Sequence, residues 1–350
     1  MPCSLPTAST PVAITTGPRR MLASMVAAAG ATALLLALLQ GCASTKAIAP
    51  DLLGFDESHL PAPDVTLRIP GLEPCNENPD RTLRLNGAEP LTVLVHGCFG
   101  SSGQFRGLAQ VLAFHGQQAA CFTYDDRDSM VVSSAQLARA LERLAQETGN
   151  RNVTVIGHSQ GALVARKALV ADRPDALAAR DLDLRLVTVS GPFSGIAAAN
   201  QCGNPLTRVL TLGLIAPMCQ IATGDKWSEI TYTSRFILEP GALLPAVRDY
   251  LKIETDERGA CRQFADGRCI ESDDVFSLAE QRNAAIDSDA QTRIVTLKSG
   301  HVEIVGDQRA APVKLIAVLQ QNGVLSATAV PQQAAFDALL SRLYVRPGLP

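Results

Sequence analysis

A serine between two glycines stands at the junction of a predicted strand and a predicted helix. The pentapeptide Gly157-His158-Ser159-Gln160-Gly161 follows the β-branched segment 152–156 and precedes the helix-forming segment 162–169. A strand that turns directly into a helix strains the backbone at the serine, and a Cβ on either side would collide with the strand or the helix. The pattern therefore predicts a strand, a tight turn and a helix, with Ser159 at the apex.

Apolar strands alternate with amphipathic helices around this turn. The expected strands are Leu91–His96, Cys121–Tyr124, Asn152–Ile156, Leu184–Ser190, Tyr250–Glu254 and Arg293–Leu297, and the expected helices include Gln104–Phe114, Ser134–Glu147, Ala162–Leu169 and Val313–Gln321. Strands that are apolar without alternation are typical of a parallel sheet that helices cover on both faces. We therefore predict an α/β domain over residues 91–325.

Three further segments surround or interrupt the predicted domain. Residues 42–90 form an extended lead-in with two short strands, Val65–Ile69 and Arg81–Leu85. The alternation stops over residues 193–247, which contain an apolar run at 209–218, and this segment is expected to be an inserted cap. Residues 326–350 carry a last amphipathic helix, Gln332–Leu343, whose packing the sequence does not indicate.

The N-terminal 41 residues predict an export signal. Arg19 and Arg20 precede an uncharged, mostly apolar run that ends before Cys42. Residues 39–42, Leu-Gln-Gly-Cys, resemble a bacterial lipobox, whose cysteine is diacylated and becomes the mature N-terminus, although Gln40 is an unusual occupant of its position. We expect an exported protein of the bacterial cell envelope, an outer-membrane lipoprotein that faces the periplasm. An uncleaved membrane anchor or ordinary signal cleavage nearby are the alternatives.

Cysteine content and charge narrow the possible classes of protein. Seven cysteines follow Cys42, and in an exported protein they predict disulfides, with Cys261–Cys269 and Cys202–Cys219 as the pairs close in sequence. No cysteine spacing resembles a zinc site, and the dinucleotide fingerprint G-x-G-x-x-G is absent, so we expect neither a metal nor a cofactor. A net charge of −3 does not indicate a nucleic-acid-binding surface.

A serine hydroxyl becomes a nucleophile when an imidazole takes its proton and a carboxylate orients that imidazole. Chains with a G-x-S-x-G turn of this kind place the three groups in the order serine, acid, histidine. Of the five histidines, only His301 follows Ser159, and it lies just past the predicted strand 293–297. The sequence therefore predicts that Ser159 and His301 meet at the carboxyl edge of the sheet.

The acid has several candidates. We favour Asp273, in a loop that leads into a helix, and its neighbour Asp274 is the alternative. Asp256 and Glu257, just after the strand 250–254, are weaker candidates. Two adjacent aspartates raise each other's pKa when both are buried, so we expect one of Asp273 and Asp274 to face solvent.

Hydrolysis through such a serine also needs backbone donors for the tetrahedral oxyanion. The expected donors are the N–H of Gln160, directly after the serine, and the N–H of Cys98 or Phe99 in the loop His96-Gly97-Cys98-Phe99-Gly100. Each donor is typically worth about 2.7–4 kcal/mol of barrier. Cys98 itself as the nucleophile is a competing idea, but it lacks a second histidine partner.

With these residues in place, segment 90–325 resembles the α/β-hydrolase superfamily, especially its lipases and esterases. His96-Gly97 is similar to the oxyanion H-G of lipases, residues 157–161 to the nucleophile elbow, 273–276 to the acid loop, and Gly300-His301 to the histidine loop. Residues 187–195 resemble the strand and G-T-P-H-x-G turn of triacylglycerol lipases, with Phe193 in place of the histidine. This departure weakens the inference to a triglyceride substrate.

The resemblance implies a serine hydrolase of carboxylic esters that acts on a small-molecule or lipidic ester. An apolar cap would favour lipidic or medium-chain esters, because each methylene removed from water contributes about 0.8 kcal/mol. Two alternatives remain: the same site could cleave a thioester or an amide, or the chain could be a catalytically idle, lipid-anchored envelope protein.

Overall fold

The computed structural model describes residues 55–98, 100–172, 182–197, 224–307 and 309–344. The predicted export signal with Cys42, the apolar run 209–218, the pair Cys202–Cys219 and the candidate donor Phe99 lie outside these residues.

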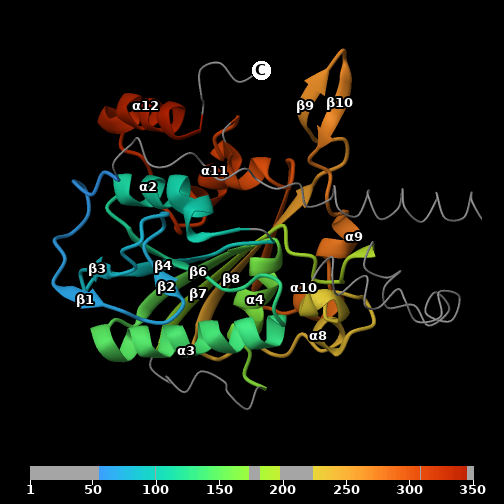
Figure 1. Cartoon of the computed structure of the whole chain (residues 1–350), viewed down its shortest axis with the longest axis horizontal. Coiled ribbons are helices and arrows are strands. Elements are labelled where there is room, and N and C mark those ends of the chain that lie inside the picture. The colour runs from blue at the N-terminus through green and yellow to red at the C-terminus, as the bar shows by residue number, and fades with distance from the viewer. Residues whose placement is uncertain (1–54, 99, 173–181, 198–223, 308, 345–350) are drawn as a thin grey trace, which may run out of the picture. The chain divides into compact units, whose positions relative to one another are not determined.

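A seven-stranded sheet forms the centre of the chain, with the strand order β11-β8-β7-β6-β4-β5-β2 (Figure 1). Its strands are β2 (Leu72–Glu73), β4 (Leu91–Val95), β5 (Gln118–Phe122), β6 (Asn152–His158), β7 (Asp183–Val189), β8 (Val247–Asp256) and β11 (Thr292–Lys298). Only β2 in this sheet pairs antiparallel, with β5, and the other pairs are parallel. All five residues of β4 are buried, as expected of a central strand covered on both faces. The predicted, mostly parallel sheet is confirmed.

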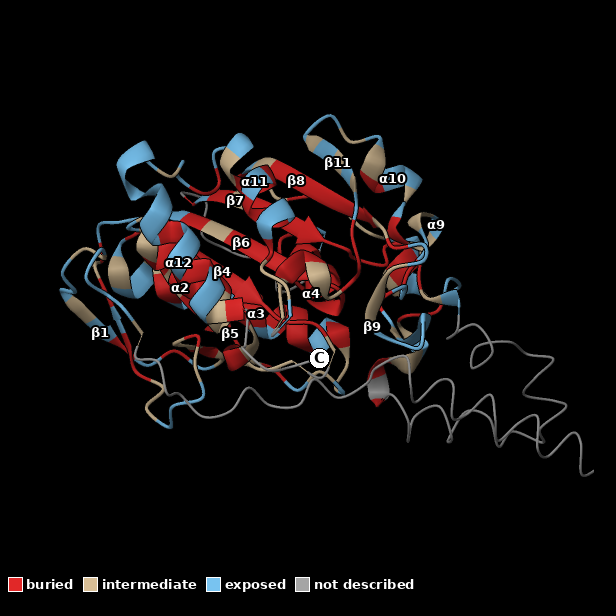
Figure 2. Ribbon diagram, turned by 90° about the horizontal axis from the view of Figure 1, so that it is seen from above, coloured by how far each residue is buried: buried red, intermediate tan, exposed pale blue. Residues whose placement is uncertain are grey.

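Helices cover the two faces of this sheet and bury two separate apolar clusters (Figures 1 and 2). One face carries α2 (Arg106–Phe114), α11 (Val313–Gln321) and α12 (Gln333–Tyr344), and the other carries α3 (Met130–Thr148) and α4 (Gln160–Ala168). Along β4 the side chains alternate between the clusters, with Val93 and Val95 on the α3 side and Leu94 on the α2 side. Because β4, β5, β6, β7, β8 and β11 run parallel, their carboxyl ends lie at one edge of this covered sheet.

Helix boundaries follow local capping. Helix α3 begins four residues before the predicted start, because the hydroxyl of Ser129 accepts a hydrogen bond from the N–H of Val132. It ends at Gly149, which has the left-handed φ of 71° that favours glycine. The C-terminal helix α12 packs on α2, where the ring of Phe336 lies 5.2 Å from that of Phe114. The sequence does not indicate this contact.

Shorter elements complete the described chain. They are β1 (Val65–Leu67), β3 (Leu83–Leu85), β9 (Cys261–Ala265), β10 (Arg268–Ser272), α8 (Arg235–Leu238), α9 (Leu278–Gln281), α10 (Ala284–Asp287), and the 3-10 turns η1 (Ser102–Phe105), η3 (Asp225–Ser228), η4 (Glu303–Val305) and η5 (Val330–Gln332). The hairpin β9–β10 was not predicted, and it projects away from the sheet (Figure 1) with Phe264 and Ile270 exposed.

Two disulfides are present among the described cysteines. Cys261–Cys269 joins the two strands of the hairpin, as predicted from their spacing. Cys75–Cys121 ties the lead-in to β5 and was not predicted. Within the described ranges, no helix is long and apolar enough to cross a bilayer, and no group of three or more His, Cys, Asp and Glu side chains is placed to hold a metal ion.

Candidate active site

Ser159 occupies a strained turn between β6 and α4. Its φ and ψ are 56° and −125°, a region that costs a non-glycine residue on the order of 1–3 kcal/mol. Its N–H donates to the carbonyl of Val189 at 2.9 Å, and its carbonyl accepts the N–H of Ala162 at 3.0 Å. The neighbouring strand β7 and the first turn of α4 therefore hold the serine at the apex.

The two glycines of the turn are required by space. A Cβ on Gly157 would lie 2.4 Å from the carbonyl oxygen of Gly161. A Cβ on Gly161 would lie 2.3 Å from the carbonyl oxygens of Val95 and His96 at the end of β4. The steric reason predicted from the sequence is confirmed, because the turn packs directly against the adjacent strand.

His301 lies beside Ser159, although 142 residues separate them in the chain. Its Nε2 is 3.0 Å from the serine Oγ, and the loop after β11 brings it there. The ring of Phe276 meets the imidazole edge-on with 4.8 Å between centroids. His158 Nε2–H donates to the carbonyl of His301 at 2.9 Å. The packing and the hydrogen bonds fix the imidazole toward the hydroxyl.

The carboxylate that holds His301 belongs to Glu257, which corrects the prediction of Asp273. Glu257 Oε1 lies 2.8 Å from His301 Nδ1 and also accepts the hydroxyl of Thr255 at 2.8 Å. Its Oε2 accepts the N–H groups of Val275 and Phe276 at 2.8 and 2.7 Å. Glu257 is 1% exposed, and these hydrogen bonds offset the cost of burying its charge.

Asp273 instead binds the backbone of the histidine loop. Its main-chain carbonyl accepts the N–H of His301 at 2.9 Å, and its carboxylate accepts the N–H groups of Val302 and Glu303 at 2.9 and 3.0 Å. The carboxylate therefore faces the start of η4 and not the imidazole ring. Burial raises the pKa of Asp273, and its two backbone hydrogen bonds oppose that shift.

The other acid candidates face outward. Asp274 is exposed and accepts the N–H of Gly259 at 3.1 Å, so one of the two adjacent aspartates faces solvent, as expected. Asp256 forms an ion pair with the exposed Arg258. Strand β8 extends two residues beyond its predicted end at Glu254, which places Glu257 directly after the strand. The sequence signal that points to Glu257 is its position directly after a strand, at the carboxyl end.

The oxyanion-loop candidates lie beside the serine. Because Gln160 is the first residue of α4, its N–H has no acceptor within the helix. A Cβ on Gly97 would lie 2.9 Å from Ser159 Cβ and 3.4 Å from its Oγ, so a glycine lets this loop approach the serine. The Cys98 thiol donates to the side-chain carbonyl oxygen of Gln160 at 3.0 Å.

Two histidines around the site are held neutral by burial. Burial places the pKa of His158 well below its ordinary value, and the nearby His301 adds to that shift. Burial also lowers the pKa of His96, whose ring stacks on Tyr124 with 4.5 Å between centroids. Both act as neutral hydrogen-bonding and packing groups at neutral pH.

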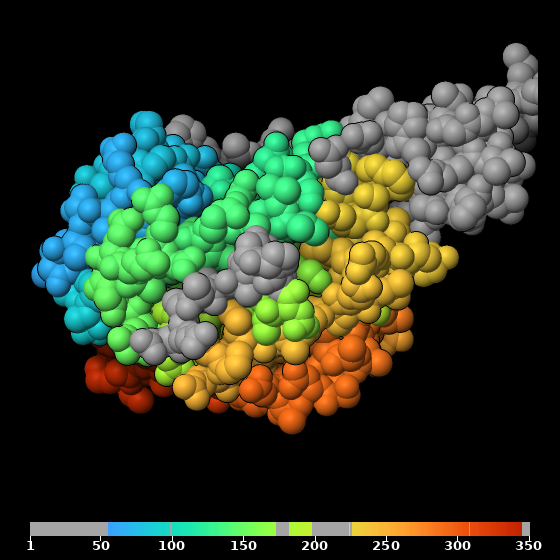
Figure 3. Space-filling view, turned by 90° about the horizontal axis from the view of Figure 1, so that it is seen from below, coloured from blue at the N-terminus to red at the C-terminus, as the bar shows by residue number. Residues whose placement is uncertain are grey.

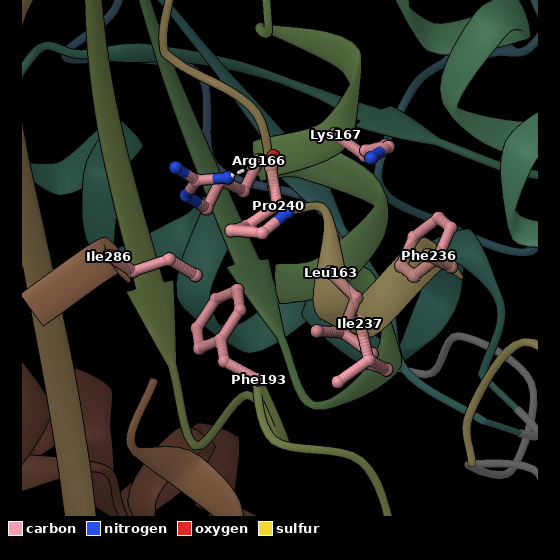
Figure 4. A pocket seen from close by; sticks show the side chains of 8 residues that line it. All are labelled: Leu163, Arg166, Lys167, Phe193, Phe236, Ile237, Pro240 and Ile286. Carbon is pink, nitrogen blue, oxygen red and sulfur yellow. Dashed lines mark hydrogen bonds between the residues drawn. The ribbon is translucent and has the colours of Figure 1, made fainter. Parts of the chain in front are cut away.

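A small apolar pocket lies apart from these residues, between α4, α8, α10 and the loop after β7 (Figure 4). It is lined by Leu163, Arg166, Lys167, Phe193, Phe236, Ile237, Pro240 and Ile286. None of the lining residues is Ser159, His301 or Glu257. The pocket is therefore separate from the hydrogen-bonded chain of these three side chains.

The sheet order and the strained serine turn define the fold: the chain has the α/β-hydrolase fold. Residues 90–179 match the family described as alpha/beta hydrolase fold, which supports placing the chain in the α/β-hydrolase superfamily. A triacylglycerol lipase from Pseudomonas fragi is 32% identical over 114 residues. That alignment covers 31% of this chain and only 36% of the lipase.

Solved structures with similar folds include lipases and esterases. The mature lipase BlEst2 from Bacillus licheniformis aligns with a TM-score of 0.47 at 17% identity, over 76% of this chain and 100% of its own. An esterase from Thermogutta terrifontis, with propionate bound, aligns with a TM-score of 0.40 at 14% identity, over 74% and 90% of the two chains.

Proposed function

We propose that the protein is a serine hydrolase that cleaves carboxylic esters. The observation that carries this proposal is the continuous hydrogen-bonded chain from Ser159 Oγ to His301 Nε2 and from His301 Nδ1 to Glu257 Oε1. A nucleophile, a base and an orienting carboxylate in this order are what acyl transfer through serine requires.

In the proposed mechanism, Ser159 Oγ attacks the ester carbonyl while His301 Nε2 takes its proton. Glu257 accepts the Nδ1–H of His301, which keeps Nε2 free to accept that proton, and its negative charge stabilises the imidazolium that forms. His301 then protonates the leaving alcohol, and an acyl-enzyme remains on Ser159. Water attacks this ester with His301 as base, which releases the acid and restores the serine.

The backbone N–H groups of Gln160 and Cys98 are the proposed oxyanion donors. Gln160 follows Ser159 in the chain, and Cys98 follows Gly97, whose backbone approaches Ser159 closely. Fixed donors of this kind stabilise the developing negative charge without reorganisation. The choice of an ester over a thioester or an amide is supported by the partial likeness to a triacylglycerol lipase.

Labelling with a fluorophosphonate tests the nucleophile. We expect wild-type protein to be labelled and Ser159→Ala not to be. Ser134→Ala is the matched control, because Ser134 is also buried but its hydroxyl donates to the carbonyl of Met130 within α3. Folded wild-type protein without labelling would refute the proposal. Rates on matched ester, thioester and amide substrates of increasing acyl length then define the substrate class.

We also propose that residues 193–247 form a cap and that the chain is an exported lipoprotein anchored through Cys42. The two disulfides support export, because such bonds persist in oxidising compartments. The backbone N–H of Ile196 donates to the carbonyl of Ile230 at 2.9 Å. The two ends of the segment between these residues therefore lie side by side on the domain, as expected of an inserted cap. Detergent partitioning of wild-type and Cys42→Ala protein expressed with the full signal tests the anchor.

A further inference from the structure

A buried lysine contacts the residues that adjoin the nucleophile. Lys226 is 3% exposed, and its Nζ lies 2.7 Å from Gln160 Oε1, 2.9 Å from Cys98 Sγ and 3.4 Å from Asp126 Oδ2. A buried ammonium is costly unless its partners are fixed around it. The position of Lys226 therefore depends on these three side chains, and theirs depend on it.

Two of these partners, Gln160 and Cys98, are the residues whose backbone N–H groups are the proposed oxyanion donors. Gln160 begins α4 and Cys98 follows β4, so the ammonium joins two segments that are separate in the chain. The Cys98 thiol also donates to Gln160 Oε1 at 3.0 Å, and Gln160 Nε2 donates to the carbonyl of Asp126 at 3.0 Å. Because an ammonium only donates, it also fixes the orientation of the Gln160 amide.

The backbone that carries Lys226 is itself fixed on the body of the domain. Gly224, with a φ of 81°, lies so close to Arg127 that a Cβ would be 2.2 Å from that residue's carbonyl oxygen. Glu229 accepts the hydroxyl of Ser129 at 2.6 Å and the N–H of Met130 at 2.5 Å. Figure 3 shows this segment, in yellow, beside the green start of α3. Contacts on both sides of Lys226 thus hold η3 in place.

We propose that Lys226 is a positioning residue for the oxyanion donors, an inference that rests on the proposed function. It ties the side chains of Gln160 and Cys98 to one fixed point and so maintains the distance and direction of their two N–H groups. The donors contribute to the rate only when they are aligned before the charge develops. Lys226 belongs to the segment proposed as the cap, so the same contacts link the cap to Gln160, the residue directly after the proposed nucleophile.

The variant Lys226→Met keeps the length of the side chain and removes its charge and donors. We expect kcat to fall about 10- to 100-fold, less than the full loss of one oxyanion donor, with KM changed less than about threefold. The affinity for a trifluoromethyl ketone, whose serine adduct places an oxyanion between the donors, should weaken in the same proportion as kcat. Lys226→Arg, which retains the charge, should recover part of both.

Lys252→Met is the matched control, because Lys252 is also buried and bridges Glu254 and Asp287. It should lower the melting temperature without weakening ketone binding. Equal loss of stability in both variants, with kcat and ketone affinity unchanged in Lys226→Met, would overturn the proposal.

If Lys226→Met does not fold, Gln160→Ala provides the test: weaker ketone binding supports the proposal, and unchanged binding refutes it.

A double-mutant cycle gives an independent readout. The effects of Lys226→Met and Gln160→Ala on ketone affinity should be non-additive, because both remove one shared contact. Additive effects would show that Lys226 does not act through Gln160 and would refute the inference. Wild-type protein that hydrolyses no ester would refute the proposed function itself, so the wild-type control distinguishes the two failures.

Discussion

The two halves of the hydrogen-bonded chain are built differently. The half with the proposed nucleophile, Ser159 at the turn from β6 to α4 (the nucleophile half), lies within one short stretch of sequence, and backbone contacts to β4 and β7 shape it. The half with the proposed acid (the acid half) is assembled from three stretches: Glu257 after β8, residues 273–276 after the hairpin, and His301 after β11. A local motif therefore identifies the first half, whereas only the tertiary structure identifies the second.

The largest expected effect is a loss of kcat, and it should differ between the two carboxylates of the acid half, Glu257 and Asp273. Glu257→Gln should lower kcat about 10³- to 10⁴-fold, because the imidazole loses the negative charge that orients it and stabilises its protonated form. Asp273→Asn, the matched variant, should lower kcat less than about 10-fold, because it weakens hydrogen bonds to the loop backbone and leaves the ring partner in place.

Steady-state kinetics and fluorophosphonate labelling rates on both variants give the comparison. A greater loss in Asp273→Asn than in Glu257→Gln would return the acid role to Asp273. Circular dichroism of each variant shows whether lost activity reflects an unfolded protein.

A second prediction concerns the nucleophile half. Gly97→Ala should lower kcat about 10²- to 10³-fold, the size of a lost oxyanion donor, because the added methyl would lie 2.9 Å from Ser159 Cβ and displace the loop. Gly87→Ala is the control, because its Cβ would meet its nearest neighbours at an ordinary 3.4 Å. Normal activity in Gly97→Ala would show that the close approach to the serine is not needed.

His158, in the nucleophile half, donates to the carbonyl of His301 in the acid half. We expect this buried histidine to make the stability of the folded protein depend on pH. Burial holds the pKa of His158 well below its ordinary value of 6.5, so the unfolded chain binds a proton there at pH values where the folded protein does not. Below pH 6.5, unfolding therefore takes up a proton at His158. This group should lower the free energy of unfolding by up to about 1.4 kcal/mol for each unit by which the pH falls.

Denaturant unfolding of wild-type and His158→Gln protein between pH 7.5 and 5.5 measures this effect. The variant lacks the titrating ring, and its stability should decrease less steeply with falling pH. Other buried groups, including His96 and Asp273, contribute to both proteins and cancel in the difference. Parallel pH profiles would contradict the prediction.

The smallest expected effect tests whether the acid half needs the hairpin disulfide. Replacing Cys261 and Cys269 with serine should change kcat less than about threefold, because the N–H of Asp273 donates to the carbonyl of Ala260 and closes the base of the hairpin without the disulfide. Kinetics of this double variant, with the wild type under reducing conditions as a second check, measure the change. A loss comparable to that of Glu257→Gln would show that the disulfide holds the acid in place.

The sequence predicted the parallel sheet, the serine turn and His301 because each depends on local pattern or on elimination. The sequence favours Asp273 over Glu257 because Asp273 lies in a loop that leads into a helix and residues 273–276 resemble the acid loop of lipases. The hairpin between the two carboxylates is not predicted, because its exposed strands carry little apolar alternation to mark them. Both carboxylates lie near His301 in space, and only the direction of their oxygens distinguishes them. The sequence does not indicate that Lys226 is buried beside the site, since a lysine in an irregular segment is ordinarily solvent-exposed.

The base of the β9–β10 hairpin has a consequence for how the chain can vary. The polypeptide departs just after Glu257 and comes back at Asp273, and the bond between Ala260 and Asp273 joins the two ends. The ion pair of Arg262 with Asp307 also ties the base of the hairpin to the histidine loop. We therefore expect that only the exposed tip, residues 265–268, can lengthen, shorten or be exchanged for another peptide without moving either carboxylate. The tip is thus an attachment point where a new recognition element could evolve or be grafted near the proposed active site.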